Sequence, residues 1–210
     1  MTGGAWPWLA LFALGAFHGI NPAMGWLFAV ALGLQERRRG AVLAALPPIA
    51  LGHALSIAAV LALLWIARES LPAWTLKVVA AAVLLGFGLY RLVRARHPGW
   101  VGMRVGFRDL TAWSFLMASA HGAGLMLVPI LLGGAGGHTG HMHGMEAFAT
   151  PLAWLGAVAV HSFGHLLVAA ALALLVYEKL GLAFLRSAWF NLDLVWGIAL
   201  VLCGVLILVV

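Results

Sequence analysis

Long apolar runs constrain this chain more than any other feature of its sequence. They cover most of the 210 residues, and only 9% of the residues are charged, which excludes a soluble globular domain. A helix needs about 20 apolar residues to cross the hydrocarbon core of a bilayer. The sequence therefore predicts an all-α integral membrane protein in the lipid bilayer, with six transmembrane helices at about 5–34, 41–66, 73–93, 110–133, 151–176 and 189–210.

Basic residues are distributed unequally between the two sets of loops. Ten of the twelve Lys and Arg residues lie in or beside the first, third and fifth loops, and only Arg68 and Lys77 lie on the other side. Because cytoplasmic loops carry the excess of positive charge, both termini are predicted to lie outside a bacterial-type cytoplasmic membrane. This topology also accounts for the net charge of +6, so no nucleic-acid partner is expected. A homo-oligomer is left open.

Polar residues interrupt the first apolar run between positions 17 and 25. His18, Asn21 and Met24 stand there among apolar neighbours, together with Pro22. Polar groups are costly in hydrocarbon unless they have a partner, so this segment predicts a binding or transport site. Proline removes a backbone donor, which predicts an interruption at Asn21-Pro22 and a kink at Pro47-Pro48.

Two dipeptides recur in the second half of the chain. His18-Gly19 is followed by His121-Gly122, and Gly52-His53 is followed by Gly164-His165, each in the corresponding span. Three spans are an odd number, so the second copy must cross the membrane in the opposite sense. We predict a single transmembrane domain over 1–210, formed by inverted repeats at about 5–93 and 110–210. Such repeats are typical of transporters with a site at the bilayer midplane.

Histidines occur near the middle of four predicted spans. At about 1.5 Å per helical residue, each lies roughly 16 to 21 Å from the face where its helix begins. His161 and His165 are also four residues apart, on one helix face, a spacing that suits two ligands of one metal ion. We therefore expect a metal site formed by His18, Asn21, Met24, His53, His121, His161 and His165.

A second group of histidines lies in the Gly/His-rich loop at 133–145. His138, His141 and His143 alternate there with methionines. Short histidine-rich tracts are typical of metal binding, and imidazole with thioether suits nickel, cobalt, copper or zinc better than magnesium or calcium. The loop is predicted to capture or release such an ion on the outer side, and a flexible linker with incidental histidines is the alternative.

One carboxylate is placed to serve proton coupling. Of six acidic residues only Asp193, near the start of the last span, falls inside the predicted bilayer. Intramembrane carboxylates are typical of proton relays, although Asp193 could instead cap or orient its helix. Histidines are the other candidates, because their protonation changes near neutral pH.

The segment around His18 resembles the first-helix motif of the nickel/cobalt exporter and permease family (NicO type) of the lysine-exporter superfamily. In that family the first histidine is followed six residues later by a second, commonly in an acidic-Pro-Gly-His context. His18 matches the first histidine and Pro22 the proline, whereas Asn21 replaces the acid and Met24 the second histidine. The resemblance implies six spans in two inverted three-helix repeats, and Met24 favours a softer ion such as Cu(I).

These patterns predict a secondary transporter that exports a transition-metal cation, with nickel, cobalt, copper or zinc as cargo. Two alternatives stay open at this point: a haem-binding or electron-transfer membrane protein that uses His53 and His165 as axial ligands, and a transporter of a small organic solute. The chain lacks a recognisable catalytic nucleophile motif, so it is not expected to be an enzyme.

Overall fold

A computed structural model describes residues 5–93, 106–132, 148–180 and 192–209, and all regular structure in these ranges is helical. The first half contains α1 (Trp6–Ile20), η1 (Pro22–Met24), α2 (Trp26–Glu36), α3 (Arg39–Ser70) and α4 (Ala73–Val93). The second half contains α5 (Phe107–Ala120), η2 (Leu125–Leu127), α6 (Val128–Leu131), α8 (Pro151–Leu175), the π-helical turn η3 (Val176–Leu180) and α10 (Leu192–Val209).

Helix length and composition show which helices can cross a membrane. Two helices, Arg39–Ser70 and Pro151–Lys179, are long and apolar enough alone, and α5 with α6 adds a third if this bent pair is one span. The shorter apolar helices are Trp6–Ile20, Trp26–Glu36, Trp74–Tyr90 and Gly197–Leu208. The predicted class, a helical protein compatible with a membrane, is confirmed.

The first predicted span is broken where the sequence predicts. α1 ends at Ile20, Asn21 is extended with ψ of 118°, and α2 begins at Trp26. Pro22 lacks the N–H that a continuing helix needs, and Gly25 has φ of +118°, a conformation that favours glycine. In contrast, α3 continues through Pro47-Pro48 without interruption.

The fourth predicted span is also broken, so the expected single helix over 110–133 is wrong. α5 ends at Ala120, and the chain turns at Gly122, which has φ of +69°. A residue in the left-handed region cannot continue a right-handed helix. The chain resumes as η2 and α6, at 49° to α5.

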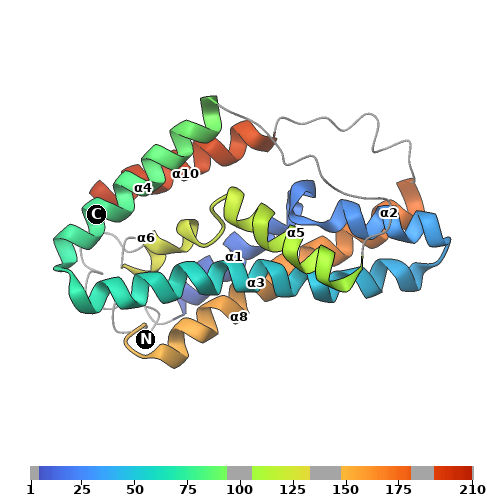
Figure 1. The fold of residues 1–210 in the computed structure, drawn as a ribbon, viewed down its shortest axis with the longest axis horizontal. Helices are drawn as coiled ribbons and strands as arrows, with labels where there is room; N and C mark the ends of the chain where they lie inside the picture. Colours follow the sequence, from blue (N-terminus) through green and yellow to red (C-terminus); the bar gives the residue numbers. More distant parts are fainter. Residues whose placement is uncertain (1–4, 94–105, 133–147, 181–191, 210) are drawn as a thin grey trace.

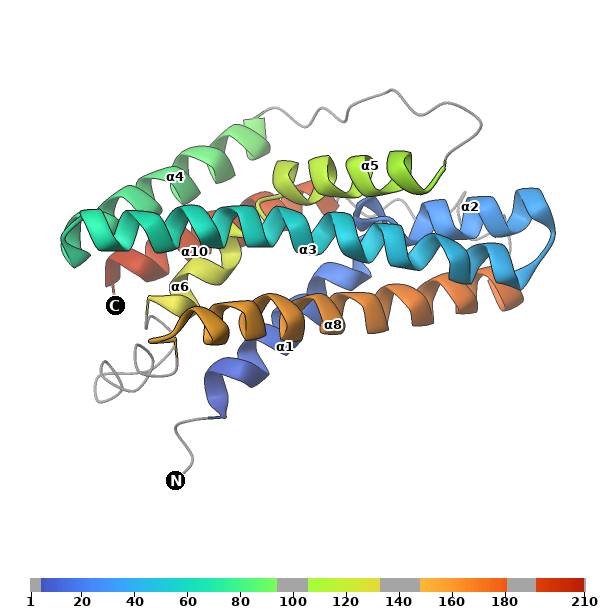
Figure 2. The ribbon, with the colours of Figure 1, turned by 60° about the horizontal axis from the view of Figure 1, so that its bottom comes forward.

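Three helix pairs build the molecule: α1 packs on α8, α5 on α3, and α4 on α10. The long helices α3 and α8 run along the length of the molecule, and α4 and α10 lie together at one side (Figure 1). Figure 2 shows that α1 begins and α10 ends toward the end of the molecule where α3 gives way to α4.

The α1–α8 and α5–α3 interfaces are built alike. Gly164 of α8 lies against the carbonyl of Phe12 and the amide nitrogen of Ala16, and Gly52 of α3 lies in the same way against Thr111 and Phe115. In both cases a Cβ atom on the glycine would collide with the facing backbone. The two glycines therefore let their helices approach closely.

A third contact matches as well. Gly15 of α1 lies against the carbonyl of His161, and Ser114 of α5 donates a hydrogen bond of 2.7 Å to the carbonyl of Ile49. These contacts share one register. At each of them the α5 residue number is the α1 number plus 99, and the α3 residue number is the α8 number minus 112.

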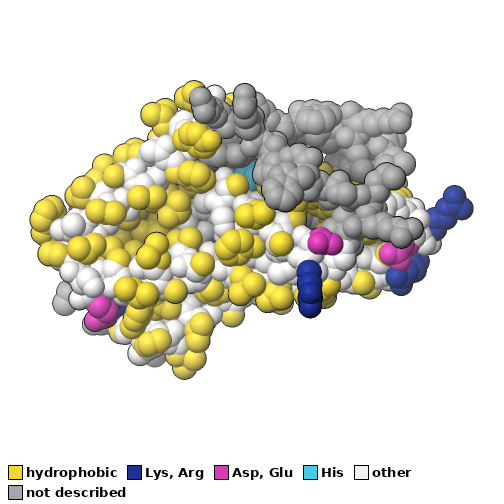
Figure 3. All heavy atoms as spheres, in the orientation of Figure 1, with side chains coloured by type: hydrophobic (Ala, Val, Ile, Leu, Met, Phe, Trp, Pro, Cys, Tyr) yellow, Lys and Arg dark blue, Asp and Glu magenta, His cyan; other side chains and the backbone are white. Residues whose placement is uncertain are grey.

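Large apolar side chains are exposed along the outer faces of the helices. Leu63, Leu152 and Leu202 are 69%, 77% and 62% exposed, and many others are similar. In the face shown in Figure 3, the visible charged side chains gather in the right half and at the far left, with apolar surface between them. Contiguous exposed apolar surface on this scale is typical of contact with lipid.

Candidate functional site

The break after α1 holds the polar segment that the sequence singled out. The Asn21 side-chain oxygen accepts a 2.9 Å hydrogen bond from the Ala23 amide, which caps η1. Asn21 and Met24 are 2% and 1% exposed, so both are buried at the break. Asn21 therefore has a structural role as a cap, which leaves its amide nitrogen as the group able to meet a ligand.

His18 lies in the last turn of α1, next to this break. Its ring is buried, and Nδ1 lies 2.8 Å from the carbonyl oxygen of Leu14. Since the carbonyl can only accept, the hydrogen bond assigns the proton to Nδ1 and leaves Nε2 with its lone pair. The helix thus holds His18 in a tautomer whose Nε2 is able to bind a metal ion.

Three other helix positions bring histidine rings to His18. The ring centre of His18 lies 5.7 Å from that of His53 in α3 and 4.9 Å from that of His161 in α8. The ring centre of His53 lies 5.6 Å from that of His161. The His53 ring also stacks on the His165 ring, with ring centres 3.9 Å apart and ring planes at 9°. Four predicted site residues from three helices therefore meet in one buried cluster, here called the histidine cluster: His18, His53, His161 and His165.

The cluster contains many polar atoms without partners. Neither ring nitrogen of His53, His161 or His165 makes a hydrogen bond in the described part of the chain. His161 approaches the backbone of Leu11, and His165 that of Met24, but without hydrogen-bond geometry. Each buried unpaired polar group costs about 1–3 kcal/mol. Six such nitrogens on three adjacent rings indicate a place built to bind something polar or charged.

The ring orientations do not yet form a complete metal site. Among the described residues, no group of three or more His, Cys, Asp or Glu side chains has its donor atoms placed to hold one ion. Parallel stacked rings such as His53 and His165 present their nitrogens side by side and not toward a common point. Rotation about χ2, which is a broad torsion for histidine, redirects ring nitrogens without a change in the backbone.

The spacing of three rings nevertheless suits one ion. With metal–nitrogen bonds of about 2.0 Å, three imidazoles around one ion have ring centres about 5 to 6 Å apart. The triangle formed by His18, His53 and His161 has sides of 5.7, 5.6 and 4.9 Å. The helices thus position three rings at the separation that shared coordination needs.

The remaining predicted ligands are placed differently. His121 is buried at the end of α5, its Nδ1 lies 2.8 Å from the Met117 carbonyl, and it is within electrostatic range of His18. His138, His141 and His143 lie outside the described residues. Asp193 is the second residue of α10, and its side chain also lies outside what the structure describes.

Two serine contacts at the α3–α5 interface were missed by the sequence analysis. The hydroxyls of Ser56 and Ser119 are 2.8 Å apart, and Ser114 donates to the Ile49 carbonyl. Their signal in the sequence was a small polar residue in an otherwise apolar span, a pattern typical of helix contacts in membranes. These residues hold the interface that positions His53.

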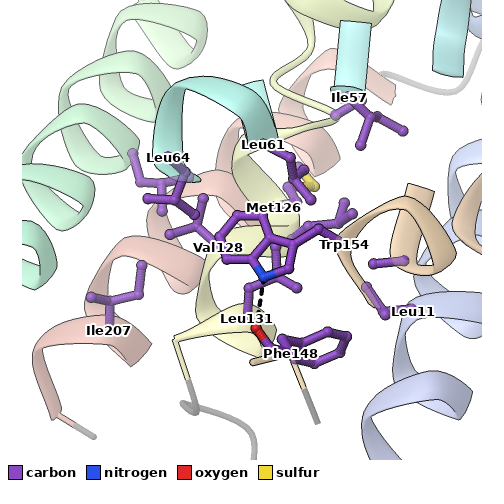
Figure 4. Packing of buried hydrophobic residues seen from close by; sticks show 14 of the residues in the cluster. Leu11, Ile57, Leu61, Leu64, Met126, Val128, Leu131, Phe148, Trp154 and Ile207 are labelled. Carbon is purple, nitrogen blue, oxygen red and sulfur yellow. Dashed lines mark hydrogen bonds between the residues drawn. The ribbon is translucent and has the colours of Figure 1, made fainter. Parts of the chain in front are cut away.

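A cluster of buried apolar side chains lies near α6 and the start of α8. Leu11, Ile57, Leu61 and Met126 pack there around Trp154, whose indole donates a 2.8 Å hydrogen bond to the Phe148 carbonyl (Figure 4). Water is excluded from such a packed region. The histidine cluster is therefore separated from that end of the molecule by apolar side chains.

These features define a class: an all-helical protein, compatible with a membrane, that buries at least five histidines in its interior. No model of a known protein family matches the chain, and no curated protein or solved structure is significantly similar to it. The function must therefore be argued from the chemistry of the site.

Proposed function

We propose that this chain is a secondary transporter that moves a transition-metal cation outward across a bacterial-type cytoplasmic membrane. The observation that carries the proposal is the triangle of buried rings formed by His18, His53 and His161, with sides of 4.9 to 5.7 Å. Imidazole suits nickel, copper and zinc, and cobalt belongs to the same series of divalent ions. The ion is the cargo of the protein.

The matched interfaces support an inverted repeat. α1, α3 and α4 correspond to α5, α8 and α10, because the α1–α8 contacts recur between α5 and α3 in one register. In this register Met117 takes the place of His18, so the equivalence of His18 with His121 expected from the sequence is shifted by one helical turn. His53 and His165 remain equivalent.

With this equivalence, the proposed site lies at the contact between the halves. A two-fold axis that relates the repeats would pass between His53 and His165, which stack at 3.9 Å. Transporters with inverted repeats bind their cargo at this kind of interface. His18 and His161 have no histidine at their equivalent positions, Met117 and Ile49, so the site lies on one side of the axis.

The two helix breaks provide further support. Each half interrupts its first helix, after Ile20 in one and after Ala120 in the other, and a 3-10 turn follows each break. Interrupted helices at corresponding positions in two halves are the arrangement from which many transporters build a binding site. In this proposal the six predicted spans include the two broken ones.

The alternatives fit the geometry less well. A haem iron with His53 and His165 as axial ligands must lie between the two rings, but they are in direct contact. An organic solute would need a cavity among the histidines, and the rings are packed against one another. A metal ion is the ligand that this spacing accommodates with the smallest rearrangement.

The distribution of charge supports the proposed topology. Arg37 and Arg38 lie between α2 and α3, Arg39 is the first residue of α3, and Arg68 lies in the last turn of α3, at its opposite end. The end with more positive charge is assigned to the cytoplasm. Both termini then face outward, as the sequence predicts.

Metal tolerance tests this function. Cells that express the chain should tolerate, and accumulate less of, at least one of nickel, cobalt, copper and zinc, and His18→Ala or His53→Ala should abolish the effect. Leu55→Ala is the matched control, because Leu55 lies on α3 beside His53 but is 48% exposed. If the native chain and the histidine variants give the same tolerance and accumulation for every metal, the proposal is wrong.

A further inference from the structure

A pocket of about 220 Å³ lies where the end of α3 meets α4, α6 and the segment that begins α8. Its described lining consists of two basic and six apolar side chains: Arg68 and Lys77, with four leucines, Phe148 and Trp154. Two positive charges thus share one pocket with apolar walls. Such a lining suits a molecule that carries a negative charge on an apolar body.

Contacts on several sides hold the Arg68 guanidinium at this pocket. It lies over the Trp65 ring at 4.4 Å and the Trp154 ring at 5.7 Å, and its Nη1 donates a 3.4 Å hydrogen bond to the Phe148 carbonyl. The two indole rings meet edge to face, with centres 5.1 Å apart. An arginine that stacks on aromatic rings still has donors for carboxylate or phosphate. Arg68 is therefore a cation that its neighbours position for an anion.

The described carboxylates balance little of the positive charge at this pocket. Among the described acids, Glu69 is the one within ion-pair distance of Arg68, at 3.8 Å, and its side chain is 65% exposed. Exposed pairs of this kind contribute little to binding or stability. Lys77 makes no ion pair with any residue that the structure describes. An anionic ligand would therefore meet one weakly paired cation and one that the described residues leave unpaired.

The pocket lies at helix ends that belong near a membrane surface. Arg68 is in the last turn of α3, Lys77 is the fifth residue of α4, and only two residues separate these helices. α3 is long and apolar enough to cross a membrane, so its last turn falls near the lipid headgroups. Trp65 and the 70% exposed Trp74 lie at the same helix ends, and tryptophan is enriched at the headgroup level. Lipid phosphates are the anions found at that level.

We propose that this pocket binds an anionic phospholipid, with Arg68 and Lys77 on its phosphate and the leucines against the start of its acyl chains. The apolar walls favour a lipid over free phosphate, which has no apolar part. The site is separate from the histidine cluster, so the proposal does not depend on which ion is transported. Because α4 packs mainly on α10, a lipid bound between α3, α4 and α8 ties this helix pair to the rest of the molecule.

Lipid titration tests the inference. The purified full chain is delipidated in a mild detergent and titrated with dioleoyl phosphatidylglycerol or with zwitterionic dioleoyl phosphatidylcholine, which has the same acyl chains, and bound lipid is measured by native mass spectrometry. The first anionic lipid molecule should bind about thirtyfold more tightly than the zwitterionic one. An excess of inorganic phosphate should not displace it. Equal binding of the two lipids, or displacement by phosphate, would overturn the inference.

Variants that remove one charge locate the site. Lys77→Gln should weaken binding of the anionic lipid about fivefold, and Arg68→Gln at least as much. Lys179→Gln is the matched control, because Lys179 is exposed in η3 and does not line the pocket, and it should bind the lipid as the native chain does. Lys77→Gln breaks no described ion pair, so it tests the site even if Arg68→Gln disturbs the tryptophans. Equal binding by Lys77→Gln and the native chain would overturn the inference.

A carboxylate of the chain itself is the competing occupant. Glu146 comes two residues before Phe148 in the sequence. Glu146→Gln should bind the anionic lipid as the native chain does. If Glu146→Gln binds it and the native chain does not, Glu146 supplies the anion of this pocket and the inference is wrong.

Discussion

His53 and His165 stack face to face in the interior, with ring centres 3.9 Å apart and planes 9° apart. Each follows a glycine that lies directly against the backbone of a partner helix, Gly52 against α5 and Gly164 against α1. The Gly-His dipeptide thus does two things at once. Its glycine lets two helices approach closely, and its histidine projects a ring from that contact into the cluster.

Replacement of His53 by phenylalanine should separate structure from binding. Phenylalanine keeps an aromatic ring against His165 and removes two buried unpaired nitrogens, so the unfolding temperature in detergent should not fall below that of the native chain, whereas metal tolerance should be lost. His53→Ala removes the ring and should also lower the free energy of unfolding by about 1 to 3 kcal/mol. Metal tolerance retained by His53→Phe would show that this imidazole is not a ligand.

Alanine at the interface glycines should destabilise the protein. A Cβ at Gly52 or Gly164 would meet backbone atoms that cannot move independently of their helix, and overpacking of this kind costs about 1–3 kcal/mol. Thermal unfolding followed by circular dichroism measures the effect. Gly86→Ala in α4 is the matched control, because nothing lies within 4 Å of its added Cβ; an equal loss there would refute the close-contact explanation.

Loss of the cap at the first helix break should also be measurable. Asn21→Ala removes the oxygen that accepts from Ala23 and should lower stability by about 1 kcal/mol. Asn21→Ser should restore most of it, since a serine hydroxyl also accepts a hydrogen bond at this position and adds no charge. If denaturant unfolding gives the same midpoint for both variants, the hydrogen bond does not stabilise the break.

The Ser114 hydroxyl should contribute to the α3–α5 interface. Ser114→Ala leaves the Ile49 carbonyl without its 2.7 Å donor and should cost about 1 kcal/mol. Ser70→Ala is the comparison, because Ser70 is exposed and its contact with Ile66 is 3.4 Å long. Equal unfolding midpoints for the two variants would show that the Ser114 hydroxyl does not stabilise the interface.

Labelling should reveal the orientation of α3. In a Cys203→Ser background, Arg68→Cys should react with an impermeant maleimide on intact spheroplasts, and Arg38→Cys should react only after permeabilisation, because the proposed topology puts the more positive end in the cytoplasm. Arg38 immediately precedes the first residue of α3, and Arg68 lies in the last turn of this helix. The reverse pattern would invert the proposed topology and make the route of transport inward.

Much of the architecture follows from local sequence. Apolar runs of sufficient length specify helices that lipid can surround, and Pro22 after Asn21 breaks the first of them, because these effects depend only on residues close in the chain. The break near Gly122 was missed, since a glycine in a helical pattern is usually tolerated. Its left-handed conformation is visible only in the folded chain.

The candidate site also follows partly from local sequence and partly from the folded chain. Apolar patterning alone predicts which segments carry buried histidines, and the four-residue spacing of His161 and His165 puts them on one helix face. The stacking of His53 on His165, and the packing of Gly52 and Gly164 against the backbones of α5 and α1, depend on the folded chain. Local patterns report depth and helix face, whereas register between helices depends on close contacts of glycine and serine with distant backbone, which no local pattern encodes.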